Sequence, residues 1–455
     1  MKPKLINISG SSGVGKTTIA KMVGFILSDS NNNILHLCGD DLHKWERDDK
    51  NWNKFTHLNP TANNINEGNI KLKYLMNGVT IKRDIYNHDN GKFIKDVKIK
   101  PADIIINEGL HSLYDSHICR LADLNIFVNT DKELTKEWKI SRDVSSRGYT
   151  EEQVISIMKM REKDDKEYIQ PQINNSDAVI NFNKKEYDSV SMQIESSLKN
   201  NELLEKLNDF YYLHKRFIIS CRSLSFEYDL IQGAGGNLSY KFDNKVVITS
   251  SGCIMSDISI LNGYSVCNSD GKIIDSNQNR PSMEIKLHTQ INRPIVLHTH
   301  PIYLNTILCS ENSEEIMSLI LDDYDYIPYT SPGEDLASKF SSDKKIVLLE
   351  NHGLVCSGDT FVEVIEESLK VNKLCKDWLV KNTKTFTNYS SDFKTSDNKN
   401  FLFPDAVILE EENSSINNYM LHIQKEVGLN PRYLNSTEIM KLKNMEAEKY
   451  RRSLL

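Results

Sequence analysis

Residues 10–17 read Gly-Ser-Ser-Gly-Val-Gly-Lys-Thr, and this octapeptide constrains the fold more than any other part of the chain. It matches Gly-x-x-x-x-Gly-Lys-Ser/Thr, in which glycines let backbone amides curl around phosphate oxygens. An apolar run, 4–8, precedes it and a helix-like run, 17–27, follows it. A chance glycine loop is the alternative, but it would not need this strand–loop–helix order. The sequence therefore predicts a phosphate-binding loop in which Lys16 neutralises phosphate charge and Thr17 contacts Mg²⁺.

Further strand-like runs at 34–38, 103–107, 124–128 and 178–182 alternate with helical patterns. This alternation predicts an α/β domain with a parallel sheet covered on both faces. A chain of 455 residues exceeds one ordinary core, so a second domain is expected. The polar, partly helical stretch after the fifth strand marks the boundary. We expect domains or segments at 1–185, 186–204 (linker), 205–385 and 386–455.

The second domain opens with an amphipathic helical stretch at 203–223. Short strands are predicted at 245–249 and 294–298, and a helix at 359–378. The C-terminal segment contains an apolar run, 406–409, that reads as a strand, and two helical runs. The second domain is thus also expected to mix strands and helices.

Composition limits the classes of partner and compartment. Lys and Arg total 56 against 63 Asp and Glu, and a net charge of −7 gives no electrostatic reason to bind nucleic acid. No apolar run reaches the roughly 18 residues of a membrane span, and the N-terminal residues lack a signal-peptide pattern. The eight cysteines are scattered, which favours reduced thiols over a disulfide framework. We expect a cytoplasmic protein that binds small molecules.

Two acidic loops follow predicted strands of the first domain. Asp40 lies just after the second strand, with His43 and Arg47 close behind, and Glu108 follows the third. Because the carboxyl ends of parallel strands share one edge of a sheet, both loops should face the phosphates. One carboxylate could take the proton from an attacking hydroxyl while the other organises a metal ion. A solvated charged loop is the alternative interpretation of the first cluster.

Residues 1–182 resemble the phosphoribulokinase/uridine kinase family. The resemblance rests on the glycine loop, Asp40…His43…Arg47, Tyr86-Asn87-His88, Lys139–Gly148, and the tail Arg161…Asp164…Tyr168–Gln172…Asp177. It implies a P-loop kinase that uses ATP with Mg²⁺, with Asp40 as general base and Glu108 as the acid that, with Thr17, holds Mg²⁺. The acceptor would contact His43, Arg47, Tyr86 and His88. The ATP contacts would be Gly10, Ser11, Ser12, Gly13, Val14, Gly15, Lys16, Thr17 and Thr18, with Arg142 and Arg147 on a lid.

The acceptor class stays open in the sequence. Trp45, Trp52 and Phe55 make this region aromatic, and they could stack on a base or sugar or simply pack together. A nucleoside, a free sugar and a sugar phosphate all remain candidates.

A histidine pattern marks the second domain. His298 and His300 are two residues apart on a predicted strand and so point to one face, and His352 follows a later strand. Three imidazoles suit Zn²⁺ or another divalent transition metal and leave a position open for substrate. Glu284 precedes this strand and could exchange protons beside the metal. Surface or core histidines are the alternative.

Residues 205–380 resemble the class II aldolase/adducin family, in 233–239, 249–252, Ser282/Glu284 and the three histidines. The resemblance implies an α/β/α domain whose metal polarises a carbonyl during carbon–carbon cleavage. It also implies that Tyr329 donates a proton in a neighbouring subunit's site, although it could simply pack, and that the protein is a homo-oligomer, a dimer or tetramer, through this domain. The substrate and its phosphate would contact Gly236, Asn237, Ser251, Gly252 and Ser282.

One departure affects the substrate. Family members acting on dihydroxyacetone phosphate have two serines before the glutamate, and here the second is Met283. One phosphate-binding hydroxyl is thus missing, and the identity of the lyase substrate stays open.

Together the two resemblances imply a bifunctional carbohydrate enzyme that phosphorylates a sugar or sugar derivative and cleaves a phosphorylated ketose. The alternatives are an active kinase whose second domain is an epimerase, decarboxylase or dehydratase, or only an oligomerising scaffold.

Overall fold

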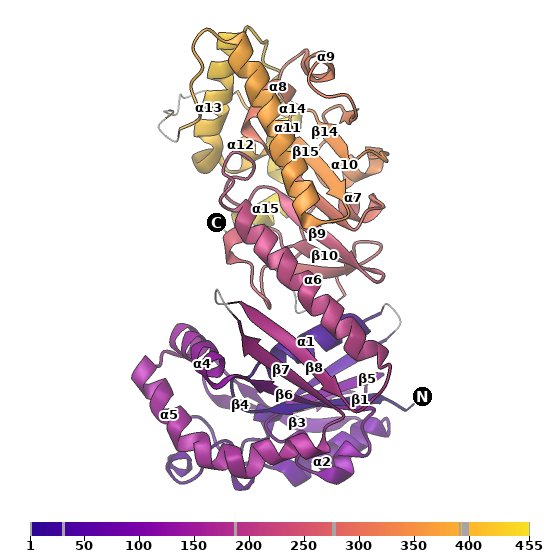
Figure 1. Ribbon diagram of the computed structural model, residues 1–455, viewed down its shortest axis with the longest axis vertical. Helices are drawn as coiled ribbons and strands as arrows, with labels where there is room; N and C mark the ends of the chain where they lie inside the picture. Colours follow the sequence, from indigo (N-terminus) through magenta and orange to yellow (C-terminus); the bar gives the residue numbers. More distant parts are fainter. Residues whose placement is uncertain are drawn as a thin grey trace. The chain divides into compact units, whose positions relative to one another are not determined.

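The computed structural model describes residues 2–29, 32–185, 189–274, 279–390, 393 and 400–454 (Figure 1). They form two compact units, Met1–Tyr212 and Leu213–Leu455, and the division falls within helix α6 (Glu202–Leu224). Each unit has its own sheet. Among the helices of the described ranges, none is long and apolar enough to cross a membrane.

The first unit contains a sheet of order β2-β5-β1-β6-β7-β8, parallel from β2 to β7. Its parallel strands are β1 (Lys4–Gly10), β2 (Ile34–Cys38), β5 (Ile104–Gly109), β6 (Leu124–Thr130) and β7 (Ala178–Lys184). The helices are α1 (Lys16–Leu27), α2 (Ile65–Met76), α3 (Ser116–Cys119), α4 (Lys132–Arg147) and α5 (Glu151–Asp164). The predicted strands and parallel sheet are confirmed.

Neighbouring residues of β5 show that both faces of this sheet are covered. Ile105 packs with Leu72 and Leu75 of α2, whereas the next residue, Ile106, faces Gly24 of α1. Successive side chains of a strand point to opposite faces, so α1 and α2 lie on opposite sides of the sheet. Strands buried on both faces read as continuous apolar runs, which explains why they were recognisable in the sequence.

Two parts of the first unit differ from the sequence-based expectation. A hairpin, β3 (Ile81–Asn87) with β4 (Lys92–Ile99), occupies a region where only helical patterns were expected. Part of the predicted linker forms β8 (Val190–Ser196), antiparallel to β7, while residues 186–188 lie outside the described ones. In β8 only Met192 is fully buried. Edge strands carry few apolar residues, and for that reason β8 resembled a linker in the sequence.

The second unit is built on a sheet of order β11-β10-β9-β12-β15-β14-β13, antiparallel except between β13 and β14. The predicted strands at 245–249 and 294–298 appear as β10 (Lys245–Thr249) and β12 (Ile295–Thr299). The other strands are β9 (Asn237–Phe242), β11 (Tyr264–Asn268), β13 (Asp325–Ile327), β14 (Ile346–Leu349) and β15 (Gly353–Gly358). Helices α7 (Ile285–Gln290), α8 (Ile302–Leu308), α9 (Ser313–Ser318), α10 (Glu334–Lys339) and α11 (Phe361–Asn382) belong to this unit.

The C-terminal segment, yellow in Figure 1, is helical: α12 (Pro404–Ile408), α13 (Glu410–Val427), α14 (Ser436–Asn444) and α15 (Glu446–Arg452). The strand predicted at 406–409 is wrong, because these residues belong largely to α12, which has Pro404 in its first turn. A run of four buried apolar residues has no periodicity that separates a strand from a helix. Val407, Ile408 and Leu409 pack against Leu434 and Leu442.

Candidate active sites

The glycine loop has the backbone that a phosphate cradle requires. Gly10, Gly13 and Gly15 have φ angles of 149°, 89° and 93°. A Cβ on Gly10 would lie 2.3 Å from the carbonyl oxygen of Val128, so no other residue fits there. Helix α1 begins at Lys16, and no described side chain caps its N-terminus. Its first amides and the positive end of its dipole are therefore free for an anion.

Lys16, Thr17 and Glu108 meet at the edge of the sheet. The Thr17 hydroxyl donates to Oε1 of Glu108 at 3.1 Å, and Lys16 Nζ donates to the Ser11 carbonyl at 2.8 Å. Burial raises the pKa of Glu108, with Lys16 opposing, and burial lowers the pKa of Lys16, with Glu108 opposing. A hydroxyl beside a carboxylate offers two oxygen ligands, which is the donor type that Mg²⁺ prefers. The pair predicted to hold Mg²⁺ is thus together.

Asp40 lies at the same edge of the sheet as Lys16, Thr17 and Glu108, because the neighbouring Gly39 packs directly against Gly109. A Cβ on Gly39 would lie 2.7 Å from the Cα of Gly109, so the loops after β2 and β5 are in backbone contact. Oδ1 of Asp40 lies 3.7 Å from Nε2 of His43, and Oδ2 lies 3.7 Å from Nε2 of His88. Burial opposes ionisation of Asp40, yet His43, His88 and Lys16 lower its pKa. Asp40 is therefore a carboxylate at neutral pH.

The adjacent carboxylate, Asp41, is tied into the fold. Its Oδ1 accepts from the backbone N–H of Tyr86 at 2.8 Å, and its Oδ2 lies 3.3 Å from Nε of Arg83. Both side chains of this ion pair are less than a tenth exposed, at 6% and 7%, whereas that of Asp40 is 34% exposed. Asp40 alone of the two faces outward.

The aromatic residues pack on one another. Trp52 stacks on His57 at 3.7 Å between ring centroids, and Trp45 lies 5.1 Å from Trp52 and 5.9 Å from Phe55. Of the two alternatives left open by the sequence, the structure shows packing. His43, buried at the centre of this group, contacts Trp52, His57 and Tyr86 edge-on.

Basic residues of α4 and α5 face the loop. Arg142 and Arg147 both contact Asp143, at 2.8 and 3.4 Å, and Lys139 Nζ lies 3.4 Å from the Ser12 hydroxyl. Burial lowers the pKa of Lys139 to about 7. Arg161 donates to Nδ1 of His57 at 2.8 Å. Lys139 and His57 were not singled out as site residues in the sequence, because their contacts, Ser12 and Arg161, lie 127 and 104 positions away.

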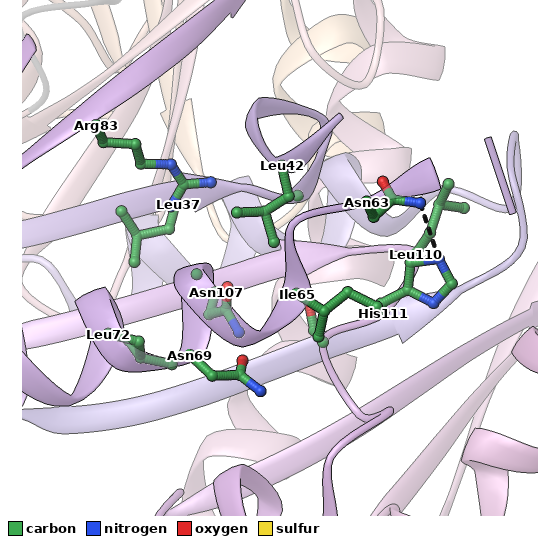
Figure 2. A pocket seen from close by; sticks show the side chains of 13 residues that line it. Leu37, Leu42, Asn63, Ile65, Asn69, Leu72, Arg83, Asn107, Leu110 and His111 are labelled. Atoms are coloured by element: carbon green, nitrogen blue, oxygen red, sulfur yellow. Dashed lines mark hydrogen bonds between the residues drawn. The ribbon is translucent and has the colours of Figure 1, made fainter. Parts of the chain in front are cut away.

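Arg47 bonds the carbonyl oxygens of His88 and Asp89, in the turn between β3 and β4. The structure thus brings together the predicted acceptor residues, from the Gly39–Arg47 region and the unpredicted hairpin. A cavity adjoins the turn that carries Asp40, because Gly39 and Leu42, on either side of Asp40 in the chain, are among its lining residues (Figure 2). Asn63 and His111, 3.4 Å apart, form part of its polar wall.

In the second unit, His298, His300 and His352 are buried and meet at one point. One nitrogen of each lies within 4.8 Å of the others. Strand β12 carries His298, His300 directly follows its last residue, and His352 precedes β15, which pairs with β12. Asn351, before His352, has a φ of 52°, and its Nδ2 donates to the carbonyl oxygens of Leu402 and Arg432, which fixes this turn. The predicted three-imidazole cluster is thus present in the fold.

The hydrogen bonds of the His298 and His300 rings fix which ring nitrogens carry protons, and this shows whether a metal ion fits between them. Nδ1 of His298 lies 3.0 Å from the carbonyl oxygen of Leu354, and Nδ1 of His300 lies 2.8 Å from Oδ2 of Asp405. Both Nδ1 atoms must donate, because their partners accept. The two Nε2 lone pairs then face each other at 2.9 Å and repel unless a cation lies between them. The residues therefore fit a divalent ion bound by imidazole nitrogens.

Glu284 lies beside the histidines. Its carboxylate oxygens are 3.4 Å from Nε2 of His298 and 3.4 Å from Nε2 of His352, and Oε2 accepts from Nδ2 of Asn237 at 2.7 Å. Burial opposes its ionisation, but His298, His352 and this hydrogen bond lower the pKa of Glu284 to about 2. Asn237, predicted to contact substrate, is thus seen to position Glu284.

One cavity collects these groups. Its lining includes the metal-site residues Glu284, His300 and His352. It also contains each residue predicted to bind the substrate or its phosphate: Gly236, Asn237, Ser251, Gly252 and Ser282. Met283 lines it too, so the departure from the two-serine pattern lies inside the cavity.

Tyr329 lies elsewhere in its own chain. Its ring packs with the C-terminal cluster around Val407 and Leu434, and Arg432 lies 5.3 Å over it. The hydroxyl is buried without a hydrogen-bond partner among the described residues, and burial raises the pKa of Tyr329. The structure does not bring Tyr329 together with the other predicted aldolase residues, and its role in a neighbouring subunit stays a prediction.

The C-terminal helices supply residues that sequence reasoning missed. Asp405 of α12 accepts from His300, and its Oδ1 accepts from Nη1 of Arg451 in α15 at 2.7 Å. Burial opposes ionisation of Asp405, but Arg451 and His300 hold its pKa well below the usual range. Both residues are over a hundred positions from His298, and a polar run such as 446–452 reads as a surface helix. No local signal could have found them.

Replacing Asp405 with Asn should weaken divalent-metal binding roughly 10- to 100-fold, because a neutral amide no longer fixes the tautomer and basicity of His300. Metal affinity is measured by competition with a chromophoric chelator. The exposed Asp257→Asn variant, in the same unit, is the matched control and should bind like wild type. Unchanged affinity in Asp405→Asn would contradict an orienting role for this carboxylate.

Each of the two units is similar to a different family of known proteins. The model of the phosphoribulokinase/uridine kinase family matches residues 5–187, and that of the class II aldolase and adducin N-terminal domain matches residues 216–379. The phosphoribulokinase of Synechocystis sp. is 33% identical over 176 residues, covering 39% of this chain and 52% of the relative. The chain spans about half the length of the phosphoribulokinases it matches.

Two further relatives are covered over most of their length. A uridine kinase of Leuconostoc citreum is 31% identical over 159 residues, which are 34% of this chain and 75% of the relative. An L-fuculose phosphate aldolase of Methanococcus vannielii is 32% identical over 179 residues, which are 35% of this chain and 95% of the relative. The chain therefore joins a member of the phosphoribulokinase/uridine kinase family to a member of the class II aldolase family.

Proposed function

We propose that this chain is a bifunctional enzyme of carbohydrate metabolism. The first unit uses ATP with Mg²⁺ to phosphorylate a hydroxyl group of a sugar or sugar derivative. The second unit uses a divalent metal ion to cleave, or in reverse to form, a carbon–carbon bond of a phosphorylated ketose.

The observation that carries the kinase proposal is the meeting of Asp40 with the phosphate loop at one sheet edge. Asp40 accepts the proton of the acceptor hydroxyl as the phosphoryl group is transferred. Lys16 and the first amides of α1 bind the phosphates, and Thr17 and Glu108 would hold Mg²⁺. Arg142 and Arg147 lie on a helix from which they can cover the transferring group.

The charges around Asp40 favour an anionic acceptor. His43 and His88 contact it, and Lys16, Arg147 and Arg161 act on it electrostatically. A nucleoside base would instead need an open aromatic face, and here the rings of Trp45, Trp52 and Phe55 pack on one another and on His57. Phosphoribulokinase, one of the relatives, is also named for a sugar phosphate. We therefore rank sugar phosphates first among acceptors.

The lyase proposal rests on the cavity that His300, His352, Glu284 and the predicted anion-binding residues line together, with His298 in the same histidine cluster. A divalent ion held by His298, His300 and His352 would polarise the substrate carbonyl. Glu284 exchanges the proton on the carbon next to that carbonyl, and Asn237 holds its carboxylate in place. Ser251 and Ser282 offer hydroxyl groups, and Gly236 and Gly252 offer close backbone approach, to a phosphate.

Two assays test the proposal. ATP consumption is measured over a panel of sugars, sugar phosphates and nucleosides, and we expect sugar phosphates to respond most. A response to nucleosides alone would refute the carbohydrate role. Products formed from phosphorylated ketoses are followed by NMR, and we expect two carbon fragments. A single rearranged, dehydrated or decarboxylated product would replace the lyase by another reaction at the same metal site.

A further inference from the structure

Helix α15 forms one wall of the metal cavity, and its side chains fasten it there. A Cβ on Gly252 would lie 2.7 Å from Cδ1 of Leu454, so this residue, two positions beyond the end of α15, covers that loop. Arg280 lies 5.5 Å from the ring centroid of Tyr450. Arg451 donates to the Ala234 carbonyl at 3.1 Å, beside the Gly235–Gly236 turn. Two residues of this helix, Glu448 and Arg451, line the cavity with Glu284, His300 and His352.

Glu448 is an unusual residue for this position. It is 1% exposed, and its Oε2 accepts no hydrogen bond from any described residue. Its nearest cation is Nη1 of Arg451 at 3.7 Å, and that nitrogen already donates to Asp405 at 2.7 Å. A buried carboxylate oxygen without a hydrogen bond is costly, so packing alone does not explain a glutamate at this position.

The surroundings of Glu448 suit proton exchange. Burial raises the pKa of Glu448 to about 7, with Arg451 and Arg452 opposing and with Asp405 and Glu284 reinforcing the shift. His300 and His352 are the other titratable groups that line the cavity. A carboxyl that exists in both forms near neutral pH can both take and return a proton.

We propose that Glu448 is a second proton-exchanging carboxyl of the metal cavity, which serves the substrate hydroxyl while Glu284 serves the carbon. This inference rests on the lyase function proposed above. In the cleavage direction Glu448 accepts the proton of the hydroxyl on the carbon that becomes the aldehyde. The O–H electron pair forms the new C=O bond, the carbon–carbon bond breaks, and its electron pair passes to the ketone fragment. Glu284, once protonated from solvent, passes that proton to this carbon, and the proton held by Glu448 returns to solvent.

If Glu448 serves the hydroxyl and Glu284 serves the carbon, cleavage and proton exchange at the carbon should respond differently to a change at Glu448. Glu448→Gln, close to isosteric, should cleave ketose phosphates roughly 10²- to 10⁴-fold more slowly. The same variant should still exchange the carbon-bound proton of the ketone fragment released by wild-type cleavage with deuterium from D₂O at the wild-type rate, since that step uses Glu284. Glu446→Gln, with its exposed carboxylate on the same helix, is the matched control and should behave as wild type in both assays.

The pH profile gives a third readout. Cleavage by the wild type should rise as pH increases through about 7, where Glu448 ionises, and Glu448→Gln should lose this rise. Metal content and thermal unfolding, measured on the same preparations, report whether the variant is folded, and Glu448→Asp should partly restore cleavage.

Each outcome decides something. Lost cleavage with retained exchange supports the inference. If Glu448→Gln loses cleavage and deuterium exchange to the same extent, the role of Glu448 is overturned. It is also overturned if the variant cleaves at the wild-type rate with the wild-type pH profile. In either case the proposed lyase function is unaffected. Wild-type protein that neither exchanges nor cleaves overturns both together.

Discussion

Replacing His298 with Asn should abolish metal binding and lower carbon–carbon cleavage by about 10³-fold or more, because the ion contributes several kcal/mol of stabilisation to the transition state. His298 holds its Nε2 toward His300 through the hydrogen bond to Leu354, and an amide at this position cannot reach the same point. Bound metal is measured by mass spectrometry of the purified protein, and cleavage by NMR of the products.

The control for this variant lies in the same chain. His422→Asn changes a half-buried histidine of α13 and should leave metal content and cleavage unchanged. ATP-dependent phosphoryl transfer should also be unaffected in His298→Asn, because its residues belong to the first unit. If His298→Asn retains both metal and cleavage, the metal-dependent reaction must be abandoned.

Replacing Asp40 with Asn should lower kcat of phosphoryl transfer by roughly 10²- to 10⁴-fold, the usual contribution of a general base. ATP binding should persist, because the loop and α1 hold the phosphates. The rate is measured by coupled ATP consumption with the best acceptor, and ATP binding by titration calorimetry. The wild-type rate in Asp40→Asn would show that another group accepts the proton.

The neighbouring residue provides a contrast for that experiment. Asp41→Asn leaves the Arg83 guanidinium buried without its carboxylate, and breaking a buried ion pair costs about 3–5 kcal/mol. We expect this variant to lower the unfolding temperature of the first unit, which Asp40→Asn should leave unchanged. We thus expect Asp40→Asn to lower the rate of phosphoryl transfer and Asp41→Asn to lower the stability. A stable but slow Asp41→Asn together with an unstable Asp40→Asn would refute the roles assigned to the two carboxylates.

The parts that could be predicted from the sequence are those that depend on neighbours in the chain. The glycine loop needs positive φ angles and a close approach, so its glycines are visible in sequence. Strands β1 and β5 are buried on both faces and read as apolar runs. His298 and His300 come together because they are two positions apart at the end of strand β12. The fold class and most of each candidate site follow from such local patterns.

The missed parts depend on distant packing. Glu448 and Arg451 are polar residues of a short helix, and nothing nearby distinguishes them from a solvated surface. Their roles arise only because the helix is fastened over Gly252 and Ala234. Residues 406–409 were predicted as a strand because a run of four apolar residues would be buried equally well in a strand or in a helix such as α12. His57 was missed because its contact, Arg161, lies 104 positions away.

The attachment of Arg451 to Asp405 has a consequence for the order in which the protein matures during synthesis. The phosphate loop, the Asp40 turn and their sheet are complete once residues up to β8 have emerged from the ribosome. The three histidines emerge later, and the ion pair that holds the carboxylate behind His300 forms only after residue 451. A nascent chain thus passes through a stage in which the phosphate loop of the first unit is complete while the cavity of the second unit still lacks a wall.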